Sequence, residues 1–166
     1  MMTDLPADFF LQDALEVAPR LLGCRLAVAG KELTITETEA YRGEADTACH
    51  AHHGRTKRTE MLYHRGGHVY VYLCYGIHSL LNIVTGAEDE PQGVLIRCCE
   101  GAAGPGRLTK ALGIDRSFNG LDILTTDGIG LWKGPACPCT TAPRVGIGYA
   151  AEEDQRRPWR FIRKGE

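Results

Sequence analysis

Two glutamates that lie two residues apart have the best spacing in this sequence for acid–base chemistry. Glu37 and Glu39 fall in an alternating run, residues 33–41, that is typical of a β-strand. Side chains two apart on a strand share a face, so both acids follow Leu33 and Ile35, and we expect this face to point inward. Buried carboxyl groups are costly unless paired or functional, and burial raises their pKa toward the range of a general base. The alternative is an edge strand whose twist or bulge exposes both acids.

A second stretch with chemical potential is aromatic. Residues 70–78 predict two alternating strands that meet at Tyr75-Gly76. Turn tips normally carry Gly, Asn, Asp or Pro, so a tyrosine there indicates a probe of the kind that DNA-kinking proteins insert between bases. Tyr70 and Tyr72 share one face and are suited to stack on an aromatic ligand. Packing of all three tyrosines in the core is the competing interpretation.

Two polar side chains stand among apolar neighbours in predicted strands. Asn82 follows Leu81, and Arg97 follows Ile96. A buried amide or guanidinium needs a partner, and base recognition or carboxylate orientation are suitable roles. The glycine-rich residues 101–106 lack the Lys and the Ser or Thr of a phosphate loop, which excludes nucleotide hydrolysis by that motif.

Cysteines and histidines could in principle form a metal site. The seven cysteines are odd in number and irregularly spaced, and Cys137-Pro138-Cys139 is the nearest approach to a ligand pair. A structural zinc site usually needs two spaced pairs, and none occurs here. We therefore expect free thiols, no metal and no cofactor.

The elements that position these residues are mostly strands. Helices are predicted at 13–22, where Pro19 either kinks the helix or starts it, and at 107–112; strands are predicted at 24–29, 33–41, 68–73, 78–84, 94–99, 123–124 and 159–162. Gly30-Lys31-Glu32 is expected to be a hairpin turn. The long polar loop 42–67 predicts a functional segment. Strands that follow strands favour one α+β domain, residues 1–166, around a largely antiparallel sheet with peripheral helices and a protruding β-hairpin.

Composition and charge bound the class of protein. The 166 residues are 43% hydrophobic and 24% charged, as in globular proteins, and no run of about 18 apolar residues or secretory signal occurs. We expect a cytoplasmic protein with no membrane contact. The net charge is −2, yet basic residues gather at 50–68 and 156–166. These segments predict one phosphate-facing surface, or else two solvated segments that never meet.

Taken together, these motifs resemble the alkyladenine (3-methyladenine) DNA glycosylase family over nearly the whole chain. The resemblance rests on Glu37-Thr38-Glu39-Ala40-Tyr41, Tyr70-Val71-Tyr72 through Tyr75-Gly76, Asn82-Ile83, Gly104-Pro105-Gly106 with Leu108, and Arg144-Val145-Gly146-Ile147-Gly148. It implies a single compact domain around a curved antiparallel sheet. It also implies base-excision repair, in which a damaged alkylated or deaminated purine is flipped out of double-stranded DNA and its N-glycosidic bond is hydrolysed.

The same resemblance implies a role for each matching residue. Glu39 would be the general base that activates a water, which Arg97 and the main-chain carbonyl of Val145 would help to hold. The base pocket would be formed by Tyr41, His50, Tyr72, Asn82, Val145 and Gly146. Tyr41 would stack on one face of the base, with His50 and Tyr72 on the other. Asn82 would lie where the 2-amino group of guanine would clash, and Tyr75 would fill the gap left in the duplex.

Two features refine the expected chemistry. No lysine falls within the segments around Glu39, Tyr72 or Asn82, so the enzyme should leave an abasic site without cutting the strand. The histidine-rich part of the loop, including His52 and His53, is not required by the family pattern. We expect a monomer. The rival interpretations are a non-catalytic nucleic-acid-binding module and a metal-dependent hydrolase built from the histidines and glutamates.

Overall fold

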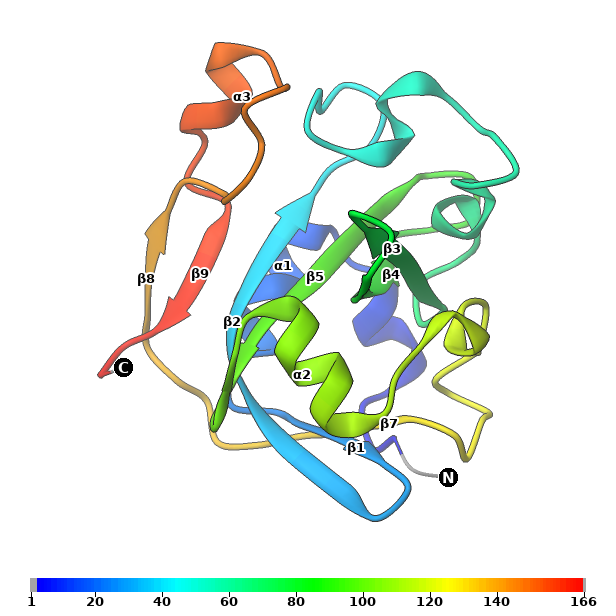
Figure 1. Cartoon of the computed structure of the whole chain (residues 1–166), viewed down its shortest axis with the longest axis vertical. Coiled ribbons are helices and arrows are strands. Elements are labelled where there is room, and N and C mark those ends of the chain that lie inside the picture. The colour runs from blue at the N-terminus through cyan, green and yellow to red at the C-terminus, as the bar shows by residue number, and fades with distance from the viewer. Residues whose placement is uncertain (1–2, 166) are drawn as a thin grey trace.

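The computed structural model describes residues 3–165 and is organised around one nine-stranded sheet (Figure 1). The strands within this part of the chain are β1 (Arg25–Val28), β2 (Lys31–Tyr41), β3 (Val69–Cys74), β4 (His78–Thr85), β5 (Gln92–Cys99), β6 (Ala102–Ala103), β7 (Gly130–Trp132), β8 (Cys139–Ala142) and β9 (Arg160–Arg163). The main order is β3-β4-β5-β2-β1-β7, with β6 paired to β5 and β9 paired to β2 and β8. All these pairs are antiparallel, as the succession of strands predicted.

Strand β2 is central because it pairs with three other strands. Its first half pairs with β1, and its second half lies between β5 and β9, so the sheet curls along it. The pairing with β5 is irregular between Ile35 and Thr38. The strand is therefore interior to the sheet, not an edge strand, although it does carry the irregularity that the alternative interpretation allowed.

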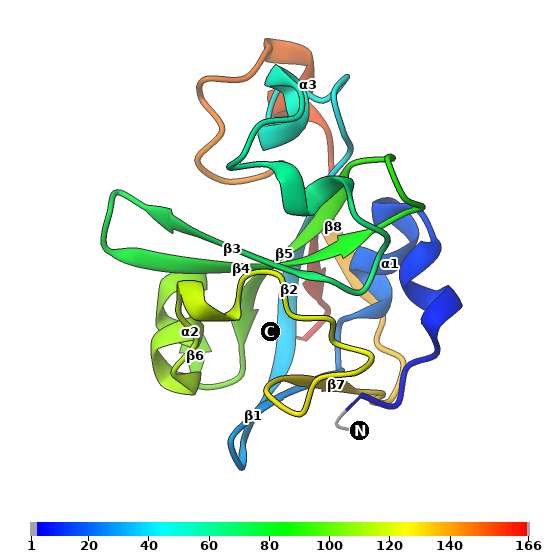
Figure 2. The ribbon, with the colours of Figure 1, turned by 90° about the vertical axis from the view of Figure 1, so that its right-hand side faces the viewer.

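Helices cover both faces of this curled sheet. They are α1 (Ala14–Arg20), α2 (Pro105–Leu112) and α3 (Glu152–Arg156), with 3₁₀ turns η1 (Ala7–Leu11), η2 (His50–His53), η3 (Glu60–Tyr63) and η4 (Arg116–Phe118). In Figures 1 and 2, α1 and α2 lie on opposite sides of β2. The hydroxyl of Thr38 donates to the carbonyl of Ala18 at 2.8 Å and ties β2 to α1. No helix within residues 3–165 is long and apolar enough to span a membrane.

The apolar residues form one main core, which makes the chain a single compact α+β domain. The largest fully buried side chains of this core come from η1, α1, the sheet and α2: Phe10, Leu21, Leu26, Ile83, Ile96 and Leu108 are examples. A smaller cluster anchors the long loop, with Leu62 and Tyr63 packed against Tyr70 and Val84. Loop 42–67 is thus held by its own apolar side chains, which keeps its polar residues in fixed positions.

Local expectations failed in four places. The first turn is Ala29-Gly30, not Gly30-Lys31-Glu32, because Val28 already pairs with Lys31 and both turn residues have positive φ. Residues 123–124 lie in a turn and not in the predicted strand. Their apolar side chains reflect packing, since Ile123 is buried in the core. The first helix begins after its Asp13 cap and ends at Arg20, with Pro19 in its last turn. Strands β6, β7 and β8 and helix α3 had no local signal.

The hairpin of β3 and β4 projects from the body of the molecule (Figure 2). Cys74 pairs with His78, so the turn is the three residues 75–77. Tyr75 and Gly76 have φ angles of 53° and 69°, the left-handed region that favours glycine. Tyr75 is 91% exposed and Ile77 is 74% exposed. The expected protruding hairpin is present, with a tyrosine in a backbone conformation that tyrosine rarely adopts.

Candidate active site

The carboxyl group of Glu39 lies fully buried on β2, with its side chain at 0% exposure. The backbone N–H of Val145 donates to Oε2 at 2.7 Å, and the hydroxyl of Tyr41 donates to Oε1 at 2.8 Å. Both donors stand on the side of β2 away from Thr38, which faces α1. The inward direction predicted for this face holds for Glu39, and both of its oxygens have a partner.

Burial and these partners act on the Glu39 pKa in opposite directions. Desolvation is the largest cause and raises the pKa above the ordinary glutamate value. The Val145 N–H, the Tyr41 hydroxyl, and the charges of Arg97 and Arg144 lower it in that order. The net result is a Glu39 pKa above the ordinary glutamate value. A carboxylate with a raised pKa and fixed orientation is suited to take a proton from water.

The second glutamate of the pair holds an arginine. Nε of Arg97 lies 3.1 Å from Oε2 of Glu37 and 3.9 Å from Oε2 of Glu39. Arg160 approaches Glu37 from β9, at 3.4 Å. Glu37 is thus paired with two guanidinium groups, whereas Glu39 has the longer approach of Arg97 and the charge of Arg144. The two acids that looked equivalent in sequence differ because their neighbours come from other strands.

A cleft of about 780 Å³ opens beside these residues. It brings together Tyr41, His50, Tyr72, Tyr75, Arg97, Val145 and Gly146, which were all predicted as site residues. Its other wall comes from α2 and the N-cap residue before it, including Gly104, Arg107 and Lys110. Side chains that are far apart in sequence therefore share one cleft, which extends along the hairpin to Tyr75 at its tip.

Asn82 lines a small deeper cavity of about 30 Å³, not the cleft itself. This cavity shares Tyr41, His50 and Tyr72 with the cleft. The Asn82 amide is buried and donates from Nδ2 to the carbonyl of Tyr70 at 3.3 Å.

The aromatic wall of the cleft contains a neutral histidine. His50 packs edge-on against Tyr72, with ring centroids 4.4 Å apart, and its Nδ1 lies 2.8 Å from the hydroxyl of Tyr70. Burial, followed by the charge of Arg58, lowers the His50 pKa to about 4. His50 is therefore uncharged near neutral pH. Burial also raises the pKa of Tyr70 to about 12, so this wall carries no charge of its own.

A buried ion pair that sequence reasoning missed holds the loops around the cleft. Arg144 and Asp46 are both almost fully buried, with Nη1 to Oδ2 at 2.7 Å and Nη2 to Oδ1 at 3.0 Å. The Arg144 guanidinium also donates to the carbonyl of Ala40 and lies 4.9 Å from the ring centroids of Tyr41 and Trp159. Arg144 stands in the motif 144–148, whereas Asp46 gave no signal in a polar loop.

Tyr149 is a second site residue that the sequence did not single out. It lines both cavities and donates its hydroxyl to the carbonyl of Ala48 at 2.7 Å. Its side chain is otherwise exposed at the mouth of the cleft. The feature of the sequence that could have indicated Tyr149 is its position directly after the glycine-containing motif 144–148.

The two basic segments of the sequence, residues 50–68 and 156–166, have different surroundings in the fold. Arg156 and Arg157 in the C-terminal segment pair with glutamates of α3, and Arg163 pairs with Glu100. Arg58, from the loop, lines the cleft together with Arg107. The expected surface built from both segments is wrong, because acids neutralise the C-terminal arginines. Within residues 3–165, no three His, Cys, Asp or Glu side chains lie together as a metal-binding group.

A buried carboxylate under an aromatic cleft and an exposed aromatic at a hairpin tip suit an enzyme that works on an extruded base. The family model described as methylpurine-DNA glycosylase matches residues 8–166. The chain therefore belongs to the methylpurine-DNA glycosylase family and is a DNA glycosylase of base-excision repair. The resemblance found in the sequence motifs is confirmed.

Curated relatives agree over nearly the full chain. A protein of Nitrosococcus oceani named as a 3-methyladenine DNA glycosylase is 45% identical, covering 96% of this chain and 90% of the relative. One of Methanocella arvoryzae with the same name is 42% identical, covering 98% and 94%. The DNA-3-methyladenine glycosylase of Arabidopsis thaliana is 38% identical over 95% of this chain and 70% of the relative.

Proposed function

We propose that this enzyme extrudes an alkylated or deaminated purine from double-stranded DNA and hydrolyses its N-glycosidic bond with a water activated by Glu39. The observation that supports this most is the complete burial of Glu39 next to a cleft of aromatic side chains. A carboxylate is expensive to bury, and here it is oriented by two donors. Such a group can both accept a proton and stabilise positive charge nearby.

The proposed chemistry follows from the charge changes in the reaction. Breaking the glycosidic bond leaves the electron pair on the base and builds oxocarbenium character on the sugar. Glu39 stabilises that positive charge and takes a proton from the water that attacks the anomeric carbon. An N-alkylated purine is already cationic and leaves as a neutral base, whereas a neutral purine needs a proton to leave.

The neighbours of Glu39 have distinct proposed roles. Arg97, anchored by Glu37, and the carbonyl of Val145 hold the attacking water. The N–H of the same Val145 binds Glu39, so one short segment aligns both base and water. This N–H contact was not part of the sequence prediction, which named the carbonyl alone.

The base pocket is proposed to work by stacking. Tyr41 would cover one face of the extruded base, and His50 with Tyr72 the other, while Gly146 leaves room at the entrance. Because His50 is neutral, the wall does not repel a cationic base. Asn82, fixed by the carbonyl of Tyr70, would clash with the 2-amino group of guanine.

We further propose that water, not an amine, is the nucleophile, and that one chain suffices. Lys110 is the lysine in the cleft lining, and it stands on α2 with Arg107 at the outer wall. Glu39 instead lies on the inner strand. We also propose that the enzyme acts on DNA as a monomer in the cytoplasm.

The test measures free base released from duplexes that carry 3-methyladenine, 7-methylguanine, hypoxanthine or ethenoadenine. Glu39→Gln should lower the rate of release by about 10²- to 10⁴-fold, the usual contribution of a general base. Glu32→Gln is the matched control, because Glu32 is an exposed glutamate on the same strand. The product strand should stay intact until it is treated with hot alkali.

Three outcomes would contradict the proposal. If no base were released from any of the four duplexes, the proposed glycosylase activity on these substrates would be contradicted. Full activity of Glu39→Gln would remove Glu39 from the mechanism and favour the DNA-binding-module interpretation if binding persisted. Stoichiometric zinc in the purified protein, with activity lost on chelation, would favour the metal-dependent hydrolase.

A further inference from the structure

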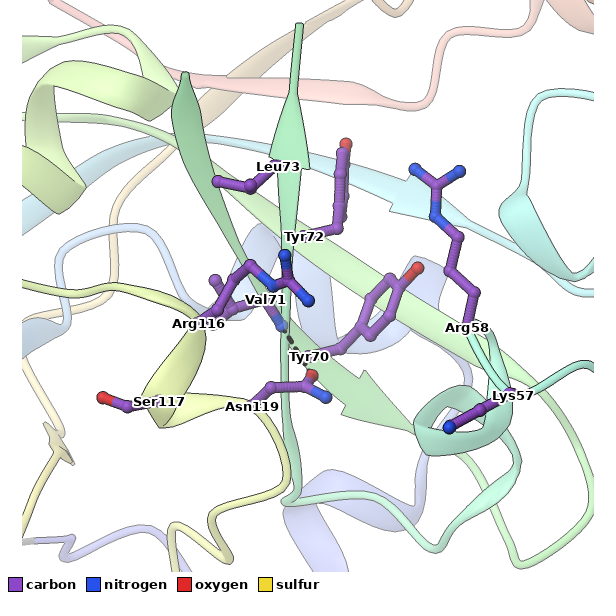
Figure 3. Close-up of a pocket in the computed structure, with 9 residues that line it drawn as sticks. All are labelled: Lys57, Arg58, Tyr70, Val71, Tyr72, Leu73, Arg116, Ser117 and Asn119. Atoms are coloured by element: carbon purple, nitrogen blue, oxygen red, sulfur yellow. Dashed lines mark hydrogen bonds between the residues drawn. The ribbon is translucent and has the colours of Figure 1, made fainter. Parts of the chain in front are cut away.

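A second large cavity lies along the outer edge of β3 and has no role in the mechanism above (Figure 3). Its volume is about 910 Å³. Lys57 and Arg58 from the long loop stand on one side, and Arg116 with Asn119 on the other. Since β3 is the terminal strand of the sheet, the cavity lies on the flank of the hairpin that β4 and the catalytic residues do not occupy.

The arginines of this cavity differ from most others in the chain. Within the described residues, Arg58, Arg107 and Arg116 are the arginines with no carboxylate partner. Each other arginine has one: Arg20, Arg25, Arg42, Arg55, Arg65, Arg97, Arg144, Arg156, Arg157, Arg160 and Arg163. The unpaired arginines all line the cleft or this second cavity. Within residues 3–165, guanidinium groups without a carboxylate partner thus occur only around the hairpin, where Arg58 also contacts Tyr70. Such groups suit an anionic ligand.

The hydrogen bonding at the edge of β3 distinguishes between two anionic ligands, an acidic peptide and a nucleic acid. Asn119 Oδ1 accepts from the N–H of Val71 at 2.9 Å, and residues 120 and 121 exchange backbone hydrogen bonds with Val69. A peptide that added a strand to this edge would have to displace these contacts. A phosphodiester backbone needs no strand pairing and binds through charge. The capped edge therefore favours nucleic acid over an acidic peptide.

The hairpin separates the two cavities. Arg58, Tyr72 and Leu73 line both of them, and Tyr75 stands at the exposed tip. A hairpin that enters the minor groove of a duplex has one strand on each flank. If the strand with the extruded base passes over the cleft, the other strand passes over the second cavity.

We propose that this cavity binds backbone phosphates of the undamaged complementary strand, chiefly through Lys57 and Arg116. The inference rests on the proposed function, since that function places the damaged strand on the cleft side. The contacts are to phosphates, so they hold the duplex against the hairpin without selecting a sequence.

The test compares Lys57→Ser/Arg116→Ser with Lys31→Ser/Lys133→Ser, which removes the same charge from exposed lysines outside both cavities. The probe is a duplex with one reduced abasic site, titrated at several salt concentrations. The cavity variant should bind at least tenfold more weakly than the control, and its slope of log affinity against log salt should be smaller by about 2. Affinity for the single damaged strand should change less than twofold.

Strand assignment is tested with neutral methylphosphonate linkages placed in one strand at a time. With wild-type protein, neutral linkages in the complementary strand should weaken DNA binding as much as the Lys57→Ser/Arg116→Ser substitutions do. With that variant, the same linkages should cause no further loss of affinity. The proposal is overturned if the damaged strand shows this pattern instead, if the single strand suffers the same loss, or if polyglutamate competes as well as DNA. Binding is measured without base release, so an inactive wild-type protein would contradict the proposed function and leave this result interpretable.

Discussion

At the scale of single residues, the state of Glu39 depends on a competition between solvation and contacts. Removal from water favours the protonated carboxyl group, and the two hydrogen bonds from Val145 and Tyr41 favour the ionised one. The charge of Arg97 lowers the Glu39 pKa less than these hydrogen bonds do, because Arg97 lies closer to Glu37. Glu39 is therefore a carboxyl group that is held in place by hydrogen bonds as a paired carboxylate is, but its pKa is raised because it is buried.

This shift makes a prediction about stability. Because the Glu39 pKa is raised in the folded state, its ionisation costs folding free energy: the contribution is fully favourable below the ordinary glutamate pKa of 4.5 and is lost as pH rises through the folded value. Glu39→Gln stays neutral, so it should unfold at a higher urea concentration than wild type at pH 7.5. The difference should close below about pH 4. A difference that does not vary with pH, or one that Glu32→Gln reproduces, would contradict the shift.

At the scale of elements, the β3–β4 hairpin combines an inner wall with an outer tip. Tyr72 forms the wall of the cleft, and Tyr75 stands at the tip three residues later. The tip conformation is unfavourable for tyrosine, whereas Gly76 beside it adopts positive φ freely. A strained, exposed aromatic side chain adds nothing to the core, which supports the prediction that Tyr75 contacts DNA.

Tyr75→Ala tests this element. Base stacking on an aromatic side chain contributes about 1–3 kcal/mol, so excision from duplex DNA should fall by roughly five- to hundredfold. Excision from a single strand should not change, because no stack has to be filled. Ile77→Ala, the other exposed apolar residue of the tip, is the matched control. Unaltered turnover on duplex by Tyr75→Ala would refute the wedge role.

At the scale of the whole molecule, the cleft is assembled by loops that meet over the end of β2. Asp46 brings the long loop to Arg144, and Asp154 of α3 accepts from the N–H of Thr47 at 3.0 Å. Arg157 donates to the same Asp154 at 2.8 Å. The contacts of Asp46 with Arg144 and of Thr47 with Asp154 join residues about a hundred positions apart. The base wall, the Glu39 donor and α3 therefore form one connected unit.

Asp46→Asn should weaken this unit strongly. Removing one partner of a buried ion pair leaves the other charge buried alone, at a cost of about 3–5 kcal/mol. The double variant Asp46→Leu/Arg144→Met should lose less than the single variant, because no charge is then left unpaired. Urea unfolding measures both, with Glu32→Gln as the exposed-pair control, expected within about 1 kcal/mol of wild type. A single variant as stable as this control would contradict the argument.

Features that depend on local chain geometry could be predicted from the order of residues. Alternation of residue types predicted β2, β3 and β4, and residues 94–99 were predicted as a strand as well, because a strand carries its pattern in adjacent residues. Burial along these strands does not alternate, since both faces of the sheet are covered. The same alternation put Glu39 on an inward face and Tyr75 at a turn. The family motifs then supplied the expected roles, which no local rule provides.

Features that depend on partners far away in the chain could be seen only once the chain was folded. Whether Glu37 or Glu39 is the neutralised acid depends on Arg160, which reaches Glu37 from the far end of the chain. Asp46 is buried because Arg144 meets it, and the basic C-terminal segment is neutralised because carboxylates lie beside it. A charge in a sequence has no partner until the chain folds, so the electrostatics of the site could not be read from residue order.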